Sequence, residues 1–245
     1  MDDILCVIPV RYGSTRFPGK PLAKILDKPM VQWVWENAKK VKIIDRVIIA
    51  TDDDRIFQAA KNFGAEVIMT DKNFKSGTDR VSEVAKKIKC GIVVNLQGDE
   101  PLISSKTIEI TIKELLKDKK AVVSTPVCRV YDEKELNDPN FVKVVFDKNK
   151  YAMYFSRAII PFIAGHSSLR KNFAFYRHIG LYVYRKNFLQ KFSKLKESQL
   201  EKIEKLEQLR ILENGYKIKV VVVNDRTIPV DNPEDIKKVE RELKI

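Results

Sequence analysis

Short apolar runs alternate with helical patterns through the first half of the chain. The runs are rich in β-branched residues and poor in charges, which is typical of strands buried on both faces of a sheet. The segments between them repeat apolar residues every three or four positions, as amphipathic helices do. The expected strands are Ile4–Pro9, Arg46–Thr51, Glu66–Met69, Gly91–Leu96 and Ala121–Pro126. The expected helices lie near Met30–Lys40, Asp53–Phe63, Thr78–Lys89 and Ser105–Lys117.

This alternation predicts an α/β fold with a doubly wound, mostly parallel sheet. Right-handed crossovers would place the carboxyl ends of its strands along one edge, where such sheets bind ligands. After Pro126 the rhythm changes to shorter strand patterns at Phe141–Asp147, Tyr151–Phe155 and Ile179–Tyr184. We therefore expect one domain over residues 1–245, with an inserted smaller β-rich lobe near residues 127–182.

The C-terminal part predicts one more strand between two helices. Gln199–Glu213 has the pattern of a single long amphipathic helix that ends at Asn214-Gly215. Lys217–Val223 is an apolar strand pattern. Asn232-Pro233 is a typical helix start, because Asn caps the first turn and Pro fits its first position.

Composition is that of a folded domain with an excess of positive charge. An apolar content of 44% in 245 residues can build one sizeable core. The net charge of +13 raises the possibility of a nucleic-acid partner. However, the cations are interleaved with acids, as in Glu201–Lys205, and no run of five like charges occurs. We therefore expect no nucleic-acid partner, and a positive field that serves small anionic substrates.

Cysteine usage and the N-terminus suggest a cytoplasmic protein. Cys6, Cys90 and Cys128 are far apart and form no C-x-x-C pair, so neither a disulfide framework nor a zinc cluster is supported. Cys6 falls inside the first apolar run and is expected to be a buried thiol. The first residues are acidic and no apolar segment approaches the length of a membrane span, so we expect no signal peptide and no membrane insertion.

The loop after the first strand carries the densest chemistry of the chain. It holds the cations Arg11, Arg16 and Lys20 beside the hydroxyls of Ser14 and Thr15. Guanidinium forks match phosphate oxygens, and glycines in the same loop let backbone N–H groups face a ligand. It is not a Walker loop, because Lys20 is followed by proline rather than Ser or Thr. Charge and glycine alone fit a phosphate-binding loop and a solvated basic loop equally well.

Two carboxylates are candidates for a magnesium site. Asp99 follows the strand Gly91–Leu96, at the expected ligand-binding edge of the sheet, and Asp231 precedes the helix start at Asn232. Magnesium bound with phosphate needs one or two carboxylates and retains waters. The alternatives are turn chemistry around Asp99 and helix capping near Asp231.

Three further motifs have both a structural and a functional interpretation. Thr51–Asp54 resembles a metal-binding D-x-D, but acids at a helix start favour capping. Ser76–Arg80 opens a helix and could bind an anion or read a base. His178 is expected to begin a strand and fits a structural role better than a chemical one, whereas His166 lies in a polar loop.

Taken together, nine stretches resemble one family, the 3-deoxy-manno-octulosonate (Kdo) cytidylyltransferases. They span the whole chain in order, although Phe162 and residues 163–172 match no pattern of the family. The stretches are IPVRYGSTRFPGKPL, ATDD, SGTDR, VNLQGDEP, VKVVFD, YAMYFSRAIIP, RHIGLYVYR, LEQLRILENG and VDNPEDI.

The resemblance implies a role for each candidate residue. The nucleotide CTP would be held at its phosphates by Arg11, Ser14, Arg16 and Lys20, with Pro9 beside them, and at its cytosine end by Ser76, Gly77, Thr78 and Arg80. The acid sugar would face Gln97, Arg157, His178, Tyr182, Glu207 and Gln208. Mg²⁺ would be carried by Asp99 and Asp231, which with Arg16 and Lys20 form the implied catalytic set. The family also implies a homodimer, with the inserted lobe contributing to the contact.

The implied reaction transfers CMP from CTP to the anomeric hydroxyl of Kdo and releases pyrophosphate, for lipopolysaccharide biosynthesis. Arg16 and Lys20 would stabilise the leaving pyrophosphate, and no His or Glu base is required. Within the class, the sugar could be 8-amino-Kdo or a sialic acid. Outside it, the chain could be a non-catalytic basic nucleotide- or RNA-binding protein.

Overall fold

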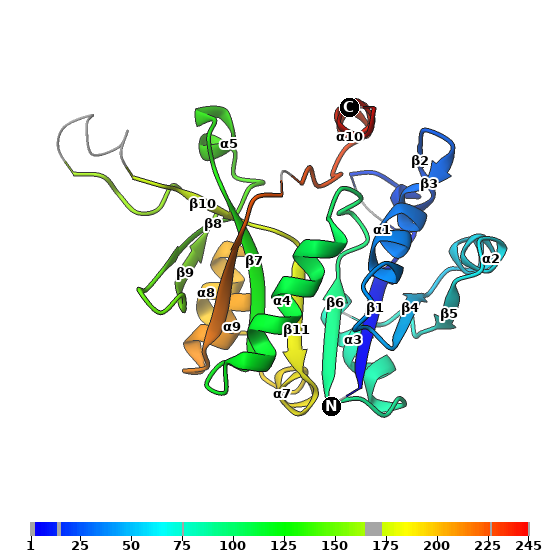
Figure 1. Cartoon of the computed structure of the whole chain (residues 1–245), viewed down its shortest axis with the longest axis horizontal. Coiled ribbons are helices and arrows are strands. Elements are labelled where there is room, and N and C mark those ends of the chain that lie inside the picture. The colour runs from blue at the N-terminus through cyan, green and yellow to red at the C-terminus, as the bar shows by residue number, and fades with distance from the viewer. Residues whose placement is uncertain (1–2, 14–15, 75, 165–172, 226, 245) are drawn as a thin grey trace.

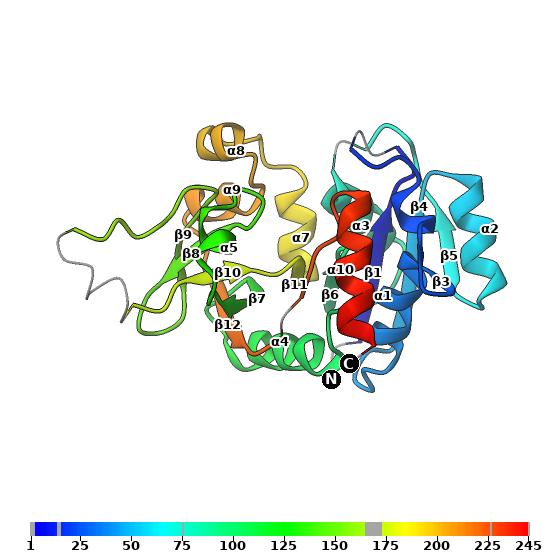
Figure 2. The same cartoon turned by 90° about the horizontal axis from the view of Figure 1, so that it is seen from above.

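The computed structural model describes residues 3–13, 16–74, 76–164, 173–225 and 227–244. Within these residues, ten strands form one sheet, which runs through the middle of the molecule with helices on both sides (Figures 1 and 2). Four of the strands are parallel neighbours in the order β5-β4-β1-β6, with the bounds Glu66–Met69, Arg46–Thr51, Ile4–Val10 and Ile92–Leu96.

The rest of the sheet is mainly antiparallel. β11 (Leu181–Arg185) joins β6 to β7 (Val123–Arg129) and runs antiparallel to both. β10, β8 and β9 continue from β7 in antiparallel pairs, with the bounds Tyr176–His178, Lys143–Phe146 and Ala152–Ser156. β12 (Ile218–Val223) pairs in parallel along the other edge of β7.

The inserted lobe expected near residues 127–182 is thus built on the main sheet. Its strands β10, β8 and β9 continue that sheet, and an isolated bridge from Tyr151 to Lys219 brings the start of β9 back toward β12. The strands therefore curl round, and residues 157–164 and 173–175, between β9 and β10, extend away from the body of the molecule (Figure 1).

Helices cover both faces of the sheet, which confirms the α/β class. One face packs against α1 (Met30–Lys39), α2 (Asp54–Asn62) and α4 (Ser105–Lys117). The other packs against α3, α7 and α9, with the bounds Gly77–Lys86, Lys186–Phe192 and Gln208–Glu213. Parallel order is confined to β5-β4-β1-β6 and the β7–β12 pair, so the sheet is mixed rather than parallel throughout.

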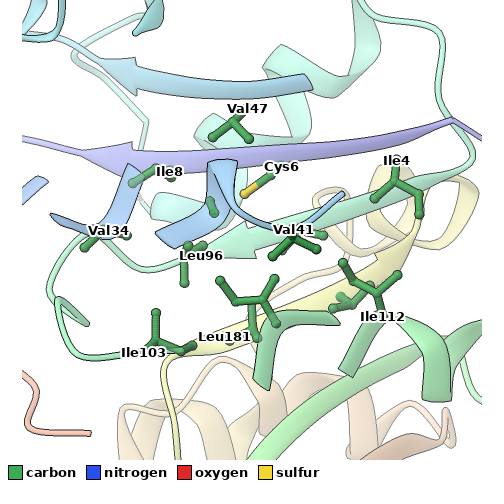
Figure 3. Packing of buried hydrophobic residues seen from close by; sticks show 14 of the residues in the cluster. Ile4, Cys6, Ile8, Val34, Val41, Val47, Leu96, Ile103, Ile112 and Leu181 are labelled. Atoms are coloured by element: carbon green, nitrogen blue, oxygen red, sulfur yellow. The ribbon is translucent and has the colours of Figure 1, made fainter. Parts of the chain in front are cut away.

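The apolar run of β1 is continuous because the strand is buried on both faces. Cys6 and Ile8 point toward α1, where they meet Val34 and Leu96 (Figure 3). The alternate residues of β1 point toward α3 on the opposite face. Cys6 is buried and free, as expected, and burial raises the pKa of its thiol far above the ordinary value.

The single helix expected over Gln199–Glu213 is wrong. The chain forms α8 (Gln199–Glu204) and α9, and between them Lys205 adopts a left-handed conformation with φ of 56°. This residue ends α8, and the chain restarts at Glu207, the N-cap residue of α9. The amphipathic pattern continues across the break because Leu206 and Leu209 both pack into the same core.

The remaining elements lie outside the two main helix layers. α5 (Glu133–Asn137) was not expected from the sequence. α10 (Pro233–Leu243) starts at the expected Asn232 cap and packs on the small β2–β3 ribbon (Lys24–Ile25 and Lys28–Pro29), where Glu240 accepts the N–H of Leu26 at 2.9 Å. In the described part of the chain, no helix combines the length and apolar character needed to span a bilayer.

The buried sheet should tolerate truncation poorly. Ile49 in β4 is fully buried, so Ile49→Ala should lower the free energy of unfolding by about 2–5 kcal/mol. The matched control is Ile203→Ala, because Ile203 is 71% exposed and its truncation should change stability by less than about 0.5 kcal/mol. Urea unfolding monitored by circular dichroism measures both, and equal losses would contradict this account of the core.

Candidate active site

A cleft of about 330 Å³ lies at the carboxyl ends of β1 and β6. The loop after β1, the start of α3, the turn after β6 and the segment before α10 all contribute to its wall. Most of the nucleotide-side residues expected from the sequence meet here. The described residues that line it include Pro9, Arg11, Arg16, Lys20, Ser76, Gly77, Arg80, Gln97, Asp99 and Asp231.

Lys20 joins the two candidate metal carboxylates. Its Nζ lies 2.8 Å from Asp99 Oδ2 and 3.7 Å from Asp231 Oδ1, and it donates to the Val230 carbonyl at 2.8 Å. The Lys20 side chain is only 14% exposed. Two carboxylate oxygens and one carbonyl oxygen thus surround a single cation.

This donor set fits magnesium as well as it fits an ammonium group. Mg²⁺ takes oxygen ligands and uses only one or two protein carboxylates when phosphates and waters complete its shell. Among the described residues, no group of three or more His, Cys, Asp or Glu forms a closed metal site. Asp99 and Asp231 are therefore suited to a metal that arrives with a phosphate ligand.

Arg16 connects the loop after β1 to two distant segments of the chain. Its Nη2 lies 2.9 Å from Asp231 Oδ1, and its Nη1 lies 3.5 Å from Asn140 Oδ1 in the loop before β8. The Arg16 side chain is 54% exposed, so much of the guanidinium faces solvent. Asn140 had no sequence signal, and Ser14 lies outside the described residues.

The start of α3 forms another wall. Ser76 is the N-cap residue, and its hydroxyl accepts the Asp79 N–H at 3.1 Å. A Cβ at Gly77 would lie 3.3 Å from Pro9 Cγ, so glycine allows the helix to approach the end of β1. Backbone N–H groups at such a helix start favour an anion.

Arg80 is held in place by a buried ion pair. Its Nη2 lies 2.7 Å from Asp52 Oδ2, and its side chain is 4% exposed. Asp53 instead caps α2 by accepting the N–H of Arg55, which confirms the capping interpretation of Thr51–Asp54. The sequence offered no sign that Asp52 would pair with Arg80.

Thr78 faces the protein interior rather than the cleft. Its hydroxyl donates to Glu207 Oε1, and it accepts from Asn95 Nδ2 at 3.1 Å. Burial raises the pKa of Glu207 to about 6, against the opposing effects of the Thr78 hydrogen bond and Arg210. The break between α8 and α9 places Glu207 where it can receive this bond.

The other sugar-side candidates lie on or beside the second half of the sheet. The His178 ring lies between Phe155 and Tyr182, with ring centroids 5.7 and 5.0 Å away, and its Nε2 is 2.8 Å from Thr125 Oγ1. Arg157 donates to the carbonyls of Glu204 and Pro139. Gln208 is buried at the start of α9. Gln97 is the one sugar-side candidate among the described residues of the cleft wall.

The strand expected at Ile179–Tyr184 is wrong in its bounds, because the chain breaks between β10 and β11. His178 therefore ends β10 instead of starting a strand. At the break, the Gly180 N–H donates to Glu100 Oε1 at 2.9 Å, and a Cβ on Gly180 would lie 3.0 Å from that oxygen. Burial, and then the charge of Asp99, raise the pKa of Glu100 to about 7.

Comparison with known proteins adds sequence and structure relatives. The family model described as Cytidylyltransferase matches residues 5–218. The 3-deoxy-manno-octulosonate cytidylyltransferase of Thermodesulfovibrio yellowstonii is 48% identical over 97% of this chain and 96% of its own. The Geobacter sulfurreducens protein of the same name is 45% identical over 99% and 100%. The solved structure of a CMP:2-keto-3-deoxy-manno-octonic acid synthetase complexed with CTP has a TM-score of 0.92 and 40% identity, covering 99% of this chain and 98% of that one.

The environment of His178 predicts that the free energy of unfolding depends on pH. Burial, with repulsion from Arg177, lowers the pKa of His178 to about 3 from 6.5. Below pH 6.5 His178 binds a proton in the unfolded chain but not in the folded chain. The contribution of His178 to the free energy of unfolding is therefore complete above pH 6.5 and is lost as the pH falls. The stability difference between wild type and His178→Gln should therefore decrease by at most about 1.4 kcal/mol per pH unit below 6.5.

Urea unfolding of both proteins between pH 8 and pH 4.5 measures this difference, in which the other titrating groups largely cancel. A difference that stays constant across the range would mean that His178 protonates as readily in the folded protein as in the unfolded chain.

Proposed function

This chain belongs to the 3-deoxy-manno-octulosonate cytidylyltransferase family, and from that premise we propose that it transfers CMP from CTP to the anomeric hydroxyl of Kdo. The observation that carries the proposal is the junction of Lys20 with Asp99 and Asp231 in the cleft. It supports the proposal because a cation suited to phosphate and two carboxylates suited to magnesium lie at the same place.

The reaction is a displacement at the α-phosphorus of CTP. The anomeric oxygen forms a bond to phosphorus and loses its proton to solvent, while the bond from the α-phosphorus to the bridging oxygen breaks and pyrophosphate leaves. Such a reaction requires mainly positioning and charge neutralisation from the protein. Arg16 and Lys20, on the loop after β1, would supply positive charge to the departing pyrophosphate.

Asp99 and Asp231 are the residues that would hold magnesium. When bound, the ion supplies charge neutralisation and acidifies the attacking hydroxyl. The ammonium of Lys20 lies among the oxygen atoms that would bind the magnesium ion. Lys20 would therefore exchange its carboxylate partners for phosphate oxygens as the triphosphate enters. Its four-carbon stem gives it the freedom to do so.

Nucleotide and sugar would occupy adjoining regions. The wall at Ser76, Gly77 and Arg80 is assigned to the cytosine end and the loop after β1 to the phosphates. Gln97 would face the sugar from the cleft wall, with Arg157, His178, Tyr182, Glu207 and Gln208 on the sugar side. An acid sugar carries a carboxylate, which a guanidinium such as that of Arg157 binds well.

The cellular setting follows from the same proposal. We place the enzyme in the cytoplasm, in lipopolysaccharide biosynthesis, and propose a homodimer formed through the lobe of β8, β9 and β10. Large apolar side chains on this lobe support the dimer, since Met153 is 65% and Phe162 is 88% exposed. Exposed apolar patches commonly mark protein–protein contacts.

Pyrophosphate release tests the function directly. With CTP and magnesium, Kdo should give rapid release, whereas UTP and ATP should give little. Including 8-amino-Kdo and a sialic acid in the same assay identifies the acid sugar, because the true substrate has the highest kcat/KM. A non-catalytic nucleotide- or RNA-binding protein would release no pyrophosphate with any sugar.

The metal ligands generate a second prediction. Asp99→Asn and Asp231→Asn keep the side-chain shape but remove a charge, so each should lower kcat/KM by at least about 100-fold at saturating magnesium. Melting temperatures should change little, because both carboxylates are partly exposed. The matched control is Asp54→Asn, an exposed acid in the first turn of α2, which should retain wild-type kinetics. Wild-type kcat/KM in either cleft variant would remove that residue from the metal site.

A further inference from the structure

Asn95 is a fully buried amide in the middle of an apolar face. It lies on β6, where alternate residues point to opposite faces, so it shares a face with Val93 and packs toward α3. Burying an amide in such surroundings is costly unless both of its polar atoms are hydrogen-bonded. Both are bonded here.

The bonds of Asn95 form a relay with one direction. Gln97 Nε2 donates to Asn95 Oδ1 at 3.1 Å, and Asn95 Nδ2 donates to Thr78 Oγ1 at 3.1 Å. A hydroxyl has one hydrogen, and Thr78 gives it to Glu207 Oε1. An ionised carboxylate only accepts hydrogen bonds. If the relay ran in the reverse direction, Thr78 would donate its hydrogen to Asn95, and the Glu207 carboxylate would face the lone pairs of the hydroxyl oxygen.

The direction of the relay fixes the orientation of the Gln97 amide. Since Nε2 is used by Asn95, the carbonyl Oε1 remains for the cleft, and a Cβ on Gly77 would lie 3.9 Å from it. Gln97 thereby presents an acceptor, which suits a hydroxyl donor. If the Gln97 amide were free to turn, it would present a donor or an acceptor at random.

We propose that Asn95 is a positioning residue that sets the Gln97 amide for a sugar hydroxyl and ties it, through Thr78, to Glu207 at the start of α9. The inference rests on the proposed function, because it takes the sugar to be the ligand of Gln97. The inference adds Asn95, which would touch neither substrate, as a residue that controls how Gln97 binds the sugar. The relay also joins the first turn of α3, on the nucleotide side, to α9 on the sugar side.

The main test separates the two substrates. Asn95→Leu keeps the approximate size of the side chain and removes both relay bonds, so the KM for Kdo should rise about tenfold while the KM for CTP changes less than about threefold. Gln97→Ala should show the same split. The double variant should be no worse than Gln97→Ala alone, because Asn95 acts through Gln97.

Ser124→Ala is the matched control for simple loss of a buried hydrogen bond. Ser124 is fully buried on β7 and donates to the Thr111 carbonyl at 2.8 Å, outside the relay. This variant should lower the melting temperature without moving the KM for Kdo. A similar rise of both KM values in Asn95→Leu, or additive effects in the double variant, would overturn the inference.

A second pair of variants decides the matter if Asn95→Leu does not fold. Thr78→Val removes the relay hydroxyl and should raise the KM for Kdo about fivefold, and Thr78→Ser should restore it. Equal KM values for Kdo in these two variants would overturn the relay. If wild type releases no pyrophosphate with Kdo, the proposed function fails and the inference falls with it. If wild type is active but Gln97→Ala is unaffected, only the sugar assignment of Gln97, and with it the inference, is wrong.

Discussion

The ammonium group of Lys20 lies between two like charges at the cleft. Asp99 and Asp231 come from distant parts of the chain and would repel each other without a cation between them. Lys20 provides that cation and also binds the Val230 carbonyl, so it links three segments, two of which are joined as well by the hydrogen bond from the Val230 N–H to the Asp99 carbonyl at 3.0 Å. An anion that draws Lys20 away removes the ammonium from Asp99, whereas Asp231 keeps its ion pair with Arg16 at 2.9 Å.

The parts of the fold that were predictable are those with a local signal. β1 and α4 have close to the expected bounds, because a strand buried on both faces and an amphipathic helix each leave a periodic pattern. The break at Lys205 leaves none, since the apolar spacing continues across it and the left-handed residue is not glycine. The break at Gly180 depends on Glu100, whose carboxylate is distant in sequence.

The candidate site, like the fold, was predictable only where the sequence carries a local signal. The position of Asp99 in the cleft was predictable because residues that follow buried parallel strands gather at one edge of a sheet. The resemblance to a family supplied Arg157, Tyr182 and Gln208, which have no distinctive local pattern. The ion pair of Asp52 with Arg80 and the place of Asn95 between Thr78 and Gln97 were not predictable, because they join side chains on different elements.

The path of the chain after β12 has a consequence for the order in which the molecule is assembled during translation. All ten strands of the main sheet, as far as the chain is described, lie within residues 3–223. Asp231 and α10 emerge from the ribosome later, and α10 docks on β2–β3, which were made near the beginning. A nascent chain can therefore contain every strand of the main sheet before its cleft has its second carboxylate and before Val230 and Val239 complete the core cluster around Ile25 and Met30.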